Sequence, residues 1–185
     1  MITALLLCAL VTPPSDTMPV TLAAAPAKPA APTMRAVPMG KVKLAVADSM
    51  VLDKSDRALT LYYRGVPVRQ YRVALGKNPL GDKLSRGDGR TPEGLFYIEA
   101  RNAQSRYHLA LRISYPDGTH RARAAQRGVS PGGDIMIHGL PDAFASVGAL
   151  HRQQDWTEGC IAVTNEEIEE IWRAVPNGAR ILIRP

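Results

Sequence analysis

The chain has 185 residues, of which 45% are hydrophobic and 22% charged, and its formal net charge is +6 at pH 7. This length predicts one compact domain preceded by a separate segment, not two full domains. No apolar run reaches the roughly eighteen residues that span a bilayer, so we expect no transmembrane helix. The positive charges are scattered and form no recognisable nucleic-acid-binding module, which argues against a nucleic-acid partner. The basic balance favours anionic partners, or simply keeps the surface solvated.

Residues 1–25 form a signal-like segment. Residues 2–11 are a short apolar core, and the alanines at 23–25 are the small residues that a signal peptidase accepts. The segment lacks a positive charge before its apolar core, and two prolines and an aspartate interrupt it at 13–16. Residues 26–40 are an Ala/Pro-rich linker, and residues 41–185 have the composition of a globular domain. We therefore expect export to the periplasm or cell envelope.

The first half of the domain is predicted to be rich in strands. β-Branched and aromatic residues mark strands at 50–53, 58–63 and 66–75, with turns at 54–56 and 64–65. Residues 75–94 are rich in Gly, Pro and Asp, and a loop of that length is usually functional or covers another segment. Further strands are expected at 95–100 and 107–115.

The second half mixes short helices with short strands. Helices are expected at 121–127 and 141–151, and strands at 134–139, 161–163 and 179–183. Thr164 and Glu167 form a capping box, and Ile168, Ile171 and Val175 follow on one helical face. This is the best-marked helix of the sequence. Together the elements predict a domain that is mainly β with short helices.

Cys160 and His138 are the candidate reactive residues. If the signal-like segment is removed, Cys160 is the one cysteine that remains in the chain. A thiol attacks as the thiolate, and a nearby imidazole can take its proton and lower its pKa. Gly159 lacks a Cβ, so its N–H and that of Cys160 could point at a developing oxyanion. Gly139 would let a backbone carbonyl hold the tautomer of His138. Alone, however, the pair is equally compatible with a buried small hydrophobic residue and a structural histidine.

The residues around the pair are more specific. Ile137-His138-Gly139 is followed, after a spacer, by Thr157-Glu158-Gly159-Cys160, and an earlier block reads Gly76, then Thr91-Pro92-Glu93-Gly94. This pattern resembles the L,D-transpeptidase catalytic domain, also called the YkuD domain, over roughly residues 50–185. Residues 128–134 and 160–165 are most similar to the YafK-like murein branch of that family.

The resemblance implies a YkuD-like β-sandwich catalytic fold, peptidoglycan stem peptides as substrate, and no metal or other cofactor. By motif position, Cys160 is the nucleophile and His138 the proton donor and acceptor. A thioester at Cys160 would be resolved by an amine in transpeptidation. Water would make the protein a murein amidase or hydrolase, for example one that releases a murein-anchored protein. A non-catalytic cell-wall binding module is a further alternative, and we expect a monomer in each case.

Four more residues are candidate substrate contacts: Thr157, Glu158, Arg112 and Trp156. Glu158 stands where many family members have His, and it either points away from the thiol, binds a substrate ammonium, or is solvated. Arg112 could bind a substrate carboxylate, or it lies on the exposed face of a strand. Trp156 could line the substrate cleft, or it packs against neighbours.

A zinc site is not expected. His108, His120 and His151 accompany His138 and Cys160, but their spacings match no standard set of zinc ligands.

Overall fold

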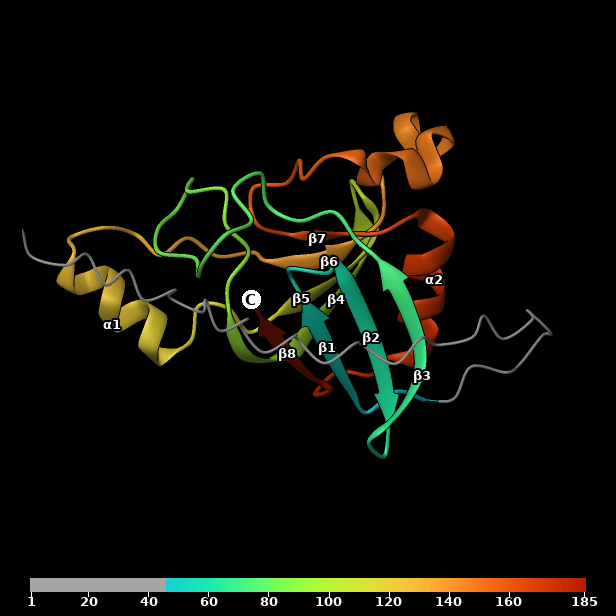
Figure 1. Ribbon diagram of the computed structural model, residues 1–185, viewed down its shortest axis with the longest axis horizontal. Coiled ribbons are helices and arrows are strands. Elements are labelled where there is room, and N and C mark those ends of the chain that lie inside the picture. The colour runs from blue at the N-terminus through green and yellow to red at the C-terminus, as the bar shows by residue number, and fades with distance from the viewer. Residues whose placement is uncertain (1–45) are drawn as a thin grey trace, which may run out of the picture. The chain divides into compact units, whose positions relative to one another are not determined.

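The computed structural model describes residues 46–185, and the predicted signal-like segment and linker lie outside the described residues. The described part is mainly β with three short helices, as expected from the sequence (Figure 1). The strands are β1 (Ser49–Asp53), β2 (Ala58–Tyr63), β3 (Val66–Arg72), β4 (Gly94–Ser105), β5 (His108–Ile113), β6 (Met136–His138), β7 (Ile161–Ala162) and β8 (Arg180–Arg184). The helices are α1 (Gly118–Gln126), the 3-10 helix η1 (Asp142–Gln153) and α2 (Asn165–Ala174). Within residues 46–185 no helix is long and apolar enough to span a membrane.

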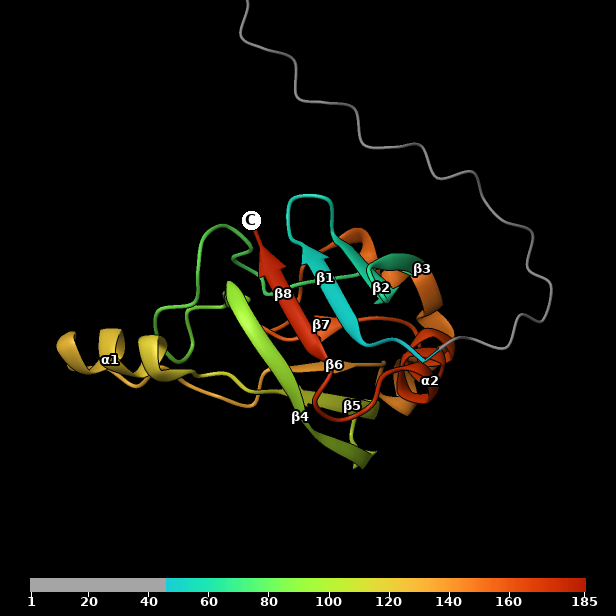
Figure 2. The ribbon, with the colours of Figure 1, turned by 90° about the horizontal axis from the view of Figure 1, so that it is seen from below.

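All eight strands belong to one curled sheet, in the order β3-β2-β1-β8-β4-β5-β6-β7. The last strand of the chain, β8, lies between β1 and β4 (Figure 2). β4 is long and joins the two halves of the sheet, because its first residues pair with β8 and its later residues pair with β5. The two ends of the order meet where Ala74, just after β3, exchanges two backbone hydrogen bonds with Ala162 of β7, at 3.0 and 2.9 Å. The sheet therefore closes on itself beside β7.

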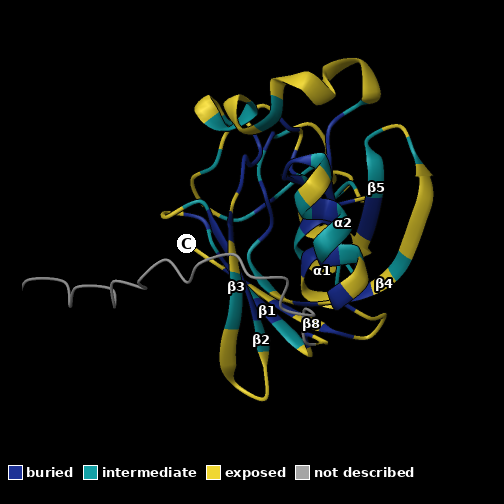
Figure 3. Ribbon diagram, turned by 90° about the vertical axis from the view of Figure 1, so that its right-hand side faces the viewer, coloured by how far each residue is buried: buried dark blue, intermediate teal, exposed yellow. Residues whose placement is uncertain are grey.

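The core lies inside this curl and under α2. Phe96 and Ile98 of β4 and Ile181 of β8 alternate with exposed neighbours, as a sheet with one buried face requires. Helix α2 packs against β5 and β6 and shows one buried stripe (Figure 3). Its predicted capping box is confirmed, since Thr164 Oγ1 accepts from the Glu167 N–H at 3.3 Å. The capped helix begins at Asn165, three residues after β7 ends at Ala162.

Two helices differ from the sequence prediction. Helix α1 starts at Gly118 and not at residue 121, because Asp117 caps it by accepting from the His120 N–H at 2.9 Å. η1 occupies the expected place, but it is a 3-10 helix with a kink at Gly148 and no buried residue. Its apolar residues Phe144 and Leu150 are 60% and 64% exposed.

Candidate active site

Two neighbouring parallel strands bring Cys160 and His138 together. β6 ends at His138, β7 begins directly after Cys160, and His138 lies opposite Ala162 in their register. Side chains two residues apart along a strand point to the same face, so Cys160 and His138 share a face. Both line one open hollow of about 270 Å³, which we call the Cys160 hollow. Its remaining walls come from Asn102, Gln104, Ser105, Arg106, Tyr107, Asp134 and Met136.

His138 is buried and its orientation is fixed by the next residue. Only 4% of His138 is exposed, and its Nδ1 lies 2.7 Å from the carbonyl oxygen of Gly139. A carbonyl oxygen only accepts, so Nδ1 carries the proton and Nε2 is left as the basic nitrogen. Burial lowers the pKa of His138, and the bond to Gly139 opposes this only in part. The imidazole is therefore neutral at pH 7 and able to accept a proton.

Gly139 is required by its surroundings. A Cβ at this position would lie 2.5 Å from Asn165 Oδ1 and 2.9 Å from Ile168 Cγ2, at the start of α2. Asn165 Oδ1 in turn accepts from the Leu140 N–H at 2.6 Å. The close approach of α2 thus fixes the turn that carries the carbonyl bound to His138.

The thiol of Cys160 is half-buried and protonated at neutral pH. Burial raises its pKa, and the charge of Asp134 acts in the same direction. A backbone hydrogen bond from Met136 and the charge of Lys83 oppose the rise. The Sγ–H donates to the carbonyl oxygen of Asp134 at 3.5 Å. This corrects the expectation of a lowered thiol pKa, and it makes a neutral thiol and a neutral imidazole the resting pair.

Gly159 is needed for its shape. Its φ is +131°, and a Cβ there would lie 2.5 Å from the carbonyl oxygen of Arg90. The Gly159 N–H donates to Thr157 Oγ1 at 3.1 Å, and this hydrogen bond competes with its predicted role as an oxyanion donor. No acceptor for the Cys160 N–H is found within residues 46–185, which leaves that amide as the candidate donor.

Thr157 is buried, and its side chain holds the backbone near the nucleophile. It is 4% exposed, and its hydroxyl donates to the Cys160 carbonyl oxygen at 2.7 Å while accepting from Gly159. Its own N–H donates to Leu75 O at 3.1 Å. These hydrogen bonds favour a structural role for Thr157 over the predicted substrate contact, because every polar group named here already has a partner.

Glu158 and Arg112 are engaged by other charged side chains. Glu158 is two-thirds exposed, and its Oε1 lies 2.6 Å from Lys77 Nζ. It is therefore solvated, which is one of the alternatives that the sequence left open. Arg112 lies on β5 with its Nε 2.9 Å from Glu99 Oε1 and its Nη1 3.6 Å from Asp134 Oδ1. Both acids compete with any substrate carboxylate, so the strand-surface alternative fits Arg112 better.

Trp156 lies beside the base. Its ring is edge-on to His138 at 5.9 Å, and the ring of Tyr107 packs against the imidazole at 4.5 Å and lies 6.3 Å from that of Trp156. Trp156 Nε1 donates to His151 Nδ1 at 3.4 Å, and burial lowers the pKa of His151 to about 4, which keeps it a neutral acceptor. Trp156 and Tyr107 also line an apolar hollow of about 420 Å³ under η1. The sequence indicated Trp156 but not Tyr107, for which it offered no signal.

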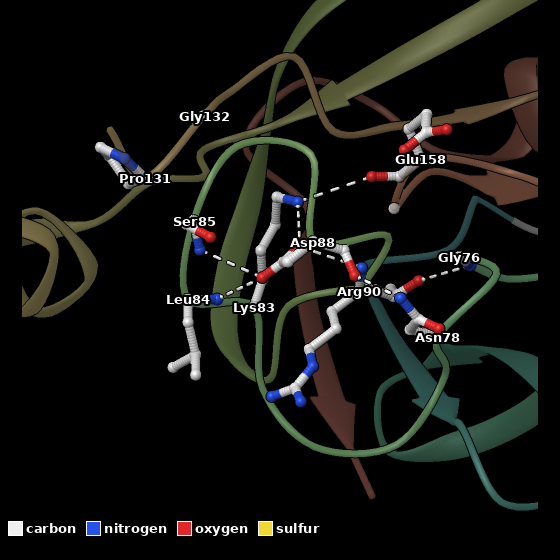
Figure 4. A network of polar contacts seen from close by, with 12 residues as sticks. Gly76, Asn78, Lys83, Leu84, Ser85, Asp88, Arg90, Pro131, Gly132 and Glu158 are labelled. Carbon is white, nitrogen blue, oxygen red and sulfur yellow. Dashed lines mark hydrogen bonds and ion pairs between the residues drawn. The ribbon is translucent and has the colours of Figure 1, made fainter. Parts of the chain in front are cut away.

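The long loop at 75–94 contains a polar network that was not predicted from the sequence (Figure 4). Lys83 is 3% exposed, and its Nζ lies 2.7 Å from Asp88 Oδ1 and 3.5 Å from the Glu158 carbonyl oxygen. Asp88 also accepts from the N–H groups of Leu84, Ser85 and Arg90, at 2.7 to 3.1 Å. The loop is thereby folded around Asp88 and connected to the residue two before the nucleophile. An Asp between two glycines, Gly87 and Gly89, was the available signal.

The same loop touches the nucleophile turn directly. A Cβ on Gly76 would lie 2.2 Å from the Gly89 carbonyl oxygen and 3.1 Å from the Cα of Gly159. The Gly76 N–H donates to Thr91 Oγ1 at 3.0 Å. The motif residues Gly76 and Thr91 are thus packed against the turn that precedes Cys160.

Within residues 46–185 no group of three or more His, Cys, Asp or Glu side chains could hold a metal ion. The other histidines already have partners: His120 contacts Asp117 and Asp82, and His108 contacts Glu169.

The family follows from a comparison with known proteins. A model of the L,D-transpeptidase catalytic domain, YkuD, matches residues 47–183. The chain belongs to this family. It is 30% identical over 138 residues to YafK of Escherichia coli (strain K12), which covers 71% of this chain and 48% of that protein. The chain thus spans about half the length of this curated relative.

Two solved structures share the fold. The helical cell shape determining protein Pgp2 from Campylobacter jejuni superposes with a TM-score of 0.56 at 24% identity, over 78% of this chain and 52% of Pgp2. Bd1075 of Bdellovibrio bacteriovorus gives a TM-score of 0.53 at 24% identity, over 76% of this chain and 51% of Bd1075. The YkuD fold expected from the sequence is therefore confirmed.

Proposed function

We propose that this chain is an exported, cysteine-dependent L,D-transpeptidase that acts on peptidoglycan stem peptides through a thioester at Cys160. The observation that carries the proposal is the hollow shared by the Cys160 thiol and the His138 imidazole, on adjacent strands of a domain that belongs to the L,D-transpeptidase family. The thiol is only partly buried, which argues against a non-catalytic wall-binding module, because a merely structural cysteine needs no opening to solvent.

The chemistry starts from the neutral pair. As Cys160 Sγ bonds to the carbonyl carbon at the L-centre of a diamino acid in the stem, its proton passes to His138 Nε2. The N–H of Cys160 donates to the oxyanion that forms. When the C–N bond breaks, His138 returns the proton to the leaving amine, and the acyl group remains on sulfur.

The second half of the reaction reverses these steps with a new nucleophile. An amine of another stem loses its proton to His138, attacks the thioester and releases the thiol, which gives a cross-link. Water in place of that amine would make the protein a murein amidase or hydrolase. Because both nucleophiles use the same base and thioester, the residues of the Cys160 hollow serve either outcome.

Digestion of purified murein followed by mass analysis of the soluble products tests the proposal. We expect the wild-type protein to form new cross-links, and Cys160→Ala to form none while keeping its circular dichroism spectrum. Trimmed stems or released proteins without new cross-links would instead assign the hydrolytic role. Full activity of Cys160→Ala would contradict the nucleophile assignment. A carbapenem should add its mass to the wild type and not to Cys160→Ala.

A further inference from the structure

A second hollow adjoins the Cys160 hollow and is lined by both signs of charge. It has a volume of about 250 Å³, and its walls are Lys83, Arg86, Gly87, Gly132, Gly133, Asp134 and Glu158. Asp134 belongs to both hollows, so the two are neighbours that share this residue in their walls. We call the second one the charged hollow; Figure 4 shows Lys83 between Gly132 and Glu158.

The charges of this hollow are not all satisfied by one another. Lys83 is paired with Asp88, and Glu158 with Lys77. Arg86 is exposed, and its guanidinium has no ion-pair partner among residues 46–185. Asp134 is 78% exposed and has only the 3.6 Å contact to Arg112. One free cation and one weakly paired anion therefore face the same small space.

The backbone keeps this space open. A Cβ on Gly133 would meet no atom within 4 Å, so the missing side chain leaves room that other residues do not fill. Asp134 has a φ of +54°, a left-handed conformation that is uncommon outside glycine and that Asp adopts more readily than most residues. This conformation directs the Asp134 carbonyl oxygen to Cys160 Sγ. Asp134 thus contacts Cys160 Sγ through its backbone carbonyl and lines both hollows.

We propose that the charged hollow is a subsite for an amino-acid zwitterion, with Arg86 binding its carboxylate and Asp134 its ammonium. The inference rests on the proposed function, in which Cys160 attacks one centre of a diamino acid. When that residue is a diamino dicarboxylic acid that is neither cross-linked nor amidated, its other centre carries an ammonium and a carboxylate on one carbon atom. A guanidinium binds a carboxylate through two parallel hydrogen bonds, and a carboxylate accepts from an ammonium. The site would therefore select stems whose diamino acid has a free far end.

Binding to the inert Cys160→Ala protein tests the subsite without requiring turnover. Three synthetic stem peptides are titrated by calorimetry: one with a free far end, one with that carboxylate amidated, and one with that ammonium acetylated. A lost charge-assisted hydrogen bond lowers affinity by about tenfold, so we expect each modified peptide to bind about tenfold more weakly. Equal affinities for the three peptides, or no binding of any, would overturn the subsite.

Two substitutions in the same background assign the partners. Arg86→Gln should weaken the free and acetylated peptides and remove the discrimination against the amide. Asp134→Asn, which tolerates the left-handed backbone, should remove only the discrimination against the acetylated peptide. Arg127→Gln, an exposed arginine at the end of α1 outside both hollows, is the matched control and should change nothing. Uniform weakening of all peptides by Arg86→Gln would contradict the assignment. Murein digestion by the wild type reports separately on the proposed function.

Discussion

His138 Nδ1 lies 2.7 Å from the carbonyl oxygen of Gly139, so the base is oriented by the backbone of the residue that follows it. A neutral carbonyl fixes the tautomer, but it stabilises an imidazolium less than a carboxylate would. Burial then decides the protonation state and lowers the pKa of His138. The base is thus available at neutral pH without a charged partner.

The first prediction concerns the dependence of activity on pH. His138 must be neutral to accept the thiol proton, and its pKa lies below the ordinary 6.5. As pH rises, kcat/KM should therefore increase through a pKa below 6.5 and be level at pH 7. His138→Ala should lower kcat/KM on stem peptides by about 10²–10⁴-fold, the usual contribution of a general base.

The pKa of the Cys160 thiol can be measured from the pH dependence of its alkylation by iodoacetamide. Because burial raises the pKa of Cys160, the alkylation midpoint should lie above the ordinary 9.0. His138→Ala should barely move this midpoint, since a neutral imidazole does not stabilise the thiolate. A midpoint below 9.0 that rises in His138→Ala would show a thiolate–imidazolium pair instead.

The second prediction is that Gly159→Ala inactivates the protein by displacing the nucleophile. The added methyl group would lie 2.5 Å from the Arg90 carbonyl oxygen at a φ of +131°, so the turn must move. A displacement near 1 Å at a reacting atom costs about 10²-fold in rate, and we expect kcat to fall at least that far. Gly118→Ala is the control, because its Cβ would meet no atom within 4 Å. Wild-type kcat in Gly159→Ala would refute the steric argument.

Local patterns explain why much of the fold was predictable. β2 has the predicted bounds, because turn residues flank its apolar and aromatic side chains. The capping box of Thr164 and Glu167 placed α2 correctly for the same local reason. The parallel pairing of β1 with β8 was not predicted, since it joins the two ends of the domain and leaves no local trace.

In the candidate site, too, the residues marked by a local motif were predicted, and those whose roles depend on distant contacts were not. The motif named Cys160 and His138, and their strands are adjacent in the sheet. The roles of Thr157 and Lys83 were missed because they depend on burial and on partners distant in sequence. Lys83 reaches Glu158 across 75 positions, a contact that no spacing rule predicts.

The third prediction separates two lysines that both contact Glu158. Lys83 is buried against Asp88, and breaking a buried pair by removing one partner costs about 3–5 kcal/mol. Lys77 forms an exposed pair with the Glu158 side chain, and such pairs contribute about 0–1 kcal/mol. Urea denaturation should therefore show a large loss for Lys83→Met and almost none for Lys77→Met.

The same variants report on the thiol. The positive charge of Lys83 lowers the pKa of Cys160, so Lys83→Met should move the alkylation midpoint to higher pH. Lys83→Arg should keep the midpoint close to that of the wild type, because it retains the charge. If Lys83→Met and Lys77→Met had equal effects on stability and on the midpoint, the Lys83 network would be no more than a surface contact.

The fourth prediction tests whether Thr157 supports the nucleophile or binds substrate. Thr157→Val keeps the shape but removes the hydroxyl, leaving the Cys160 carbonyl oxygen and the Gly159 N–H without their present partner. Unsatisfied buried groups cost about 1–3 kcal/mol each, so the free energy of unfolding should fall by that order and kcat should decrease. Thr157→Ser retains both hydrogen bonds and should restore kcat. A substrate contact would instead raise KM at unchanged stability, and that result would return Thr157 to the binding surface.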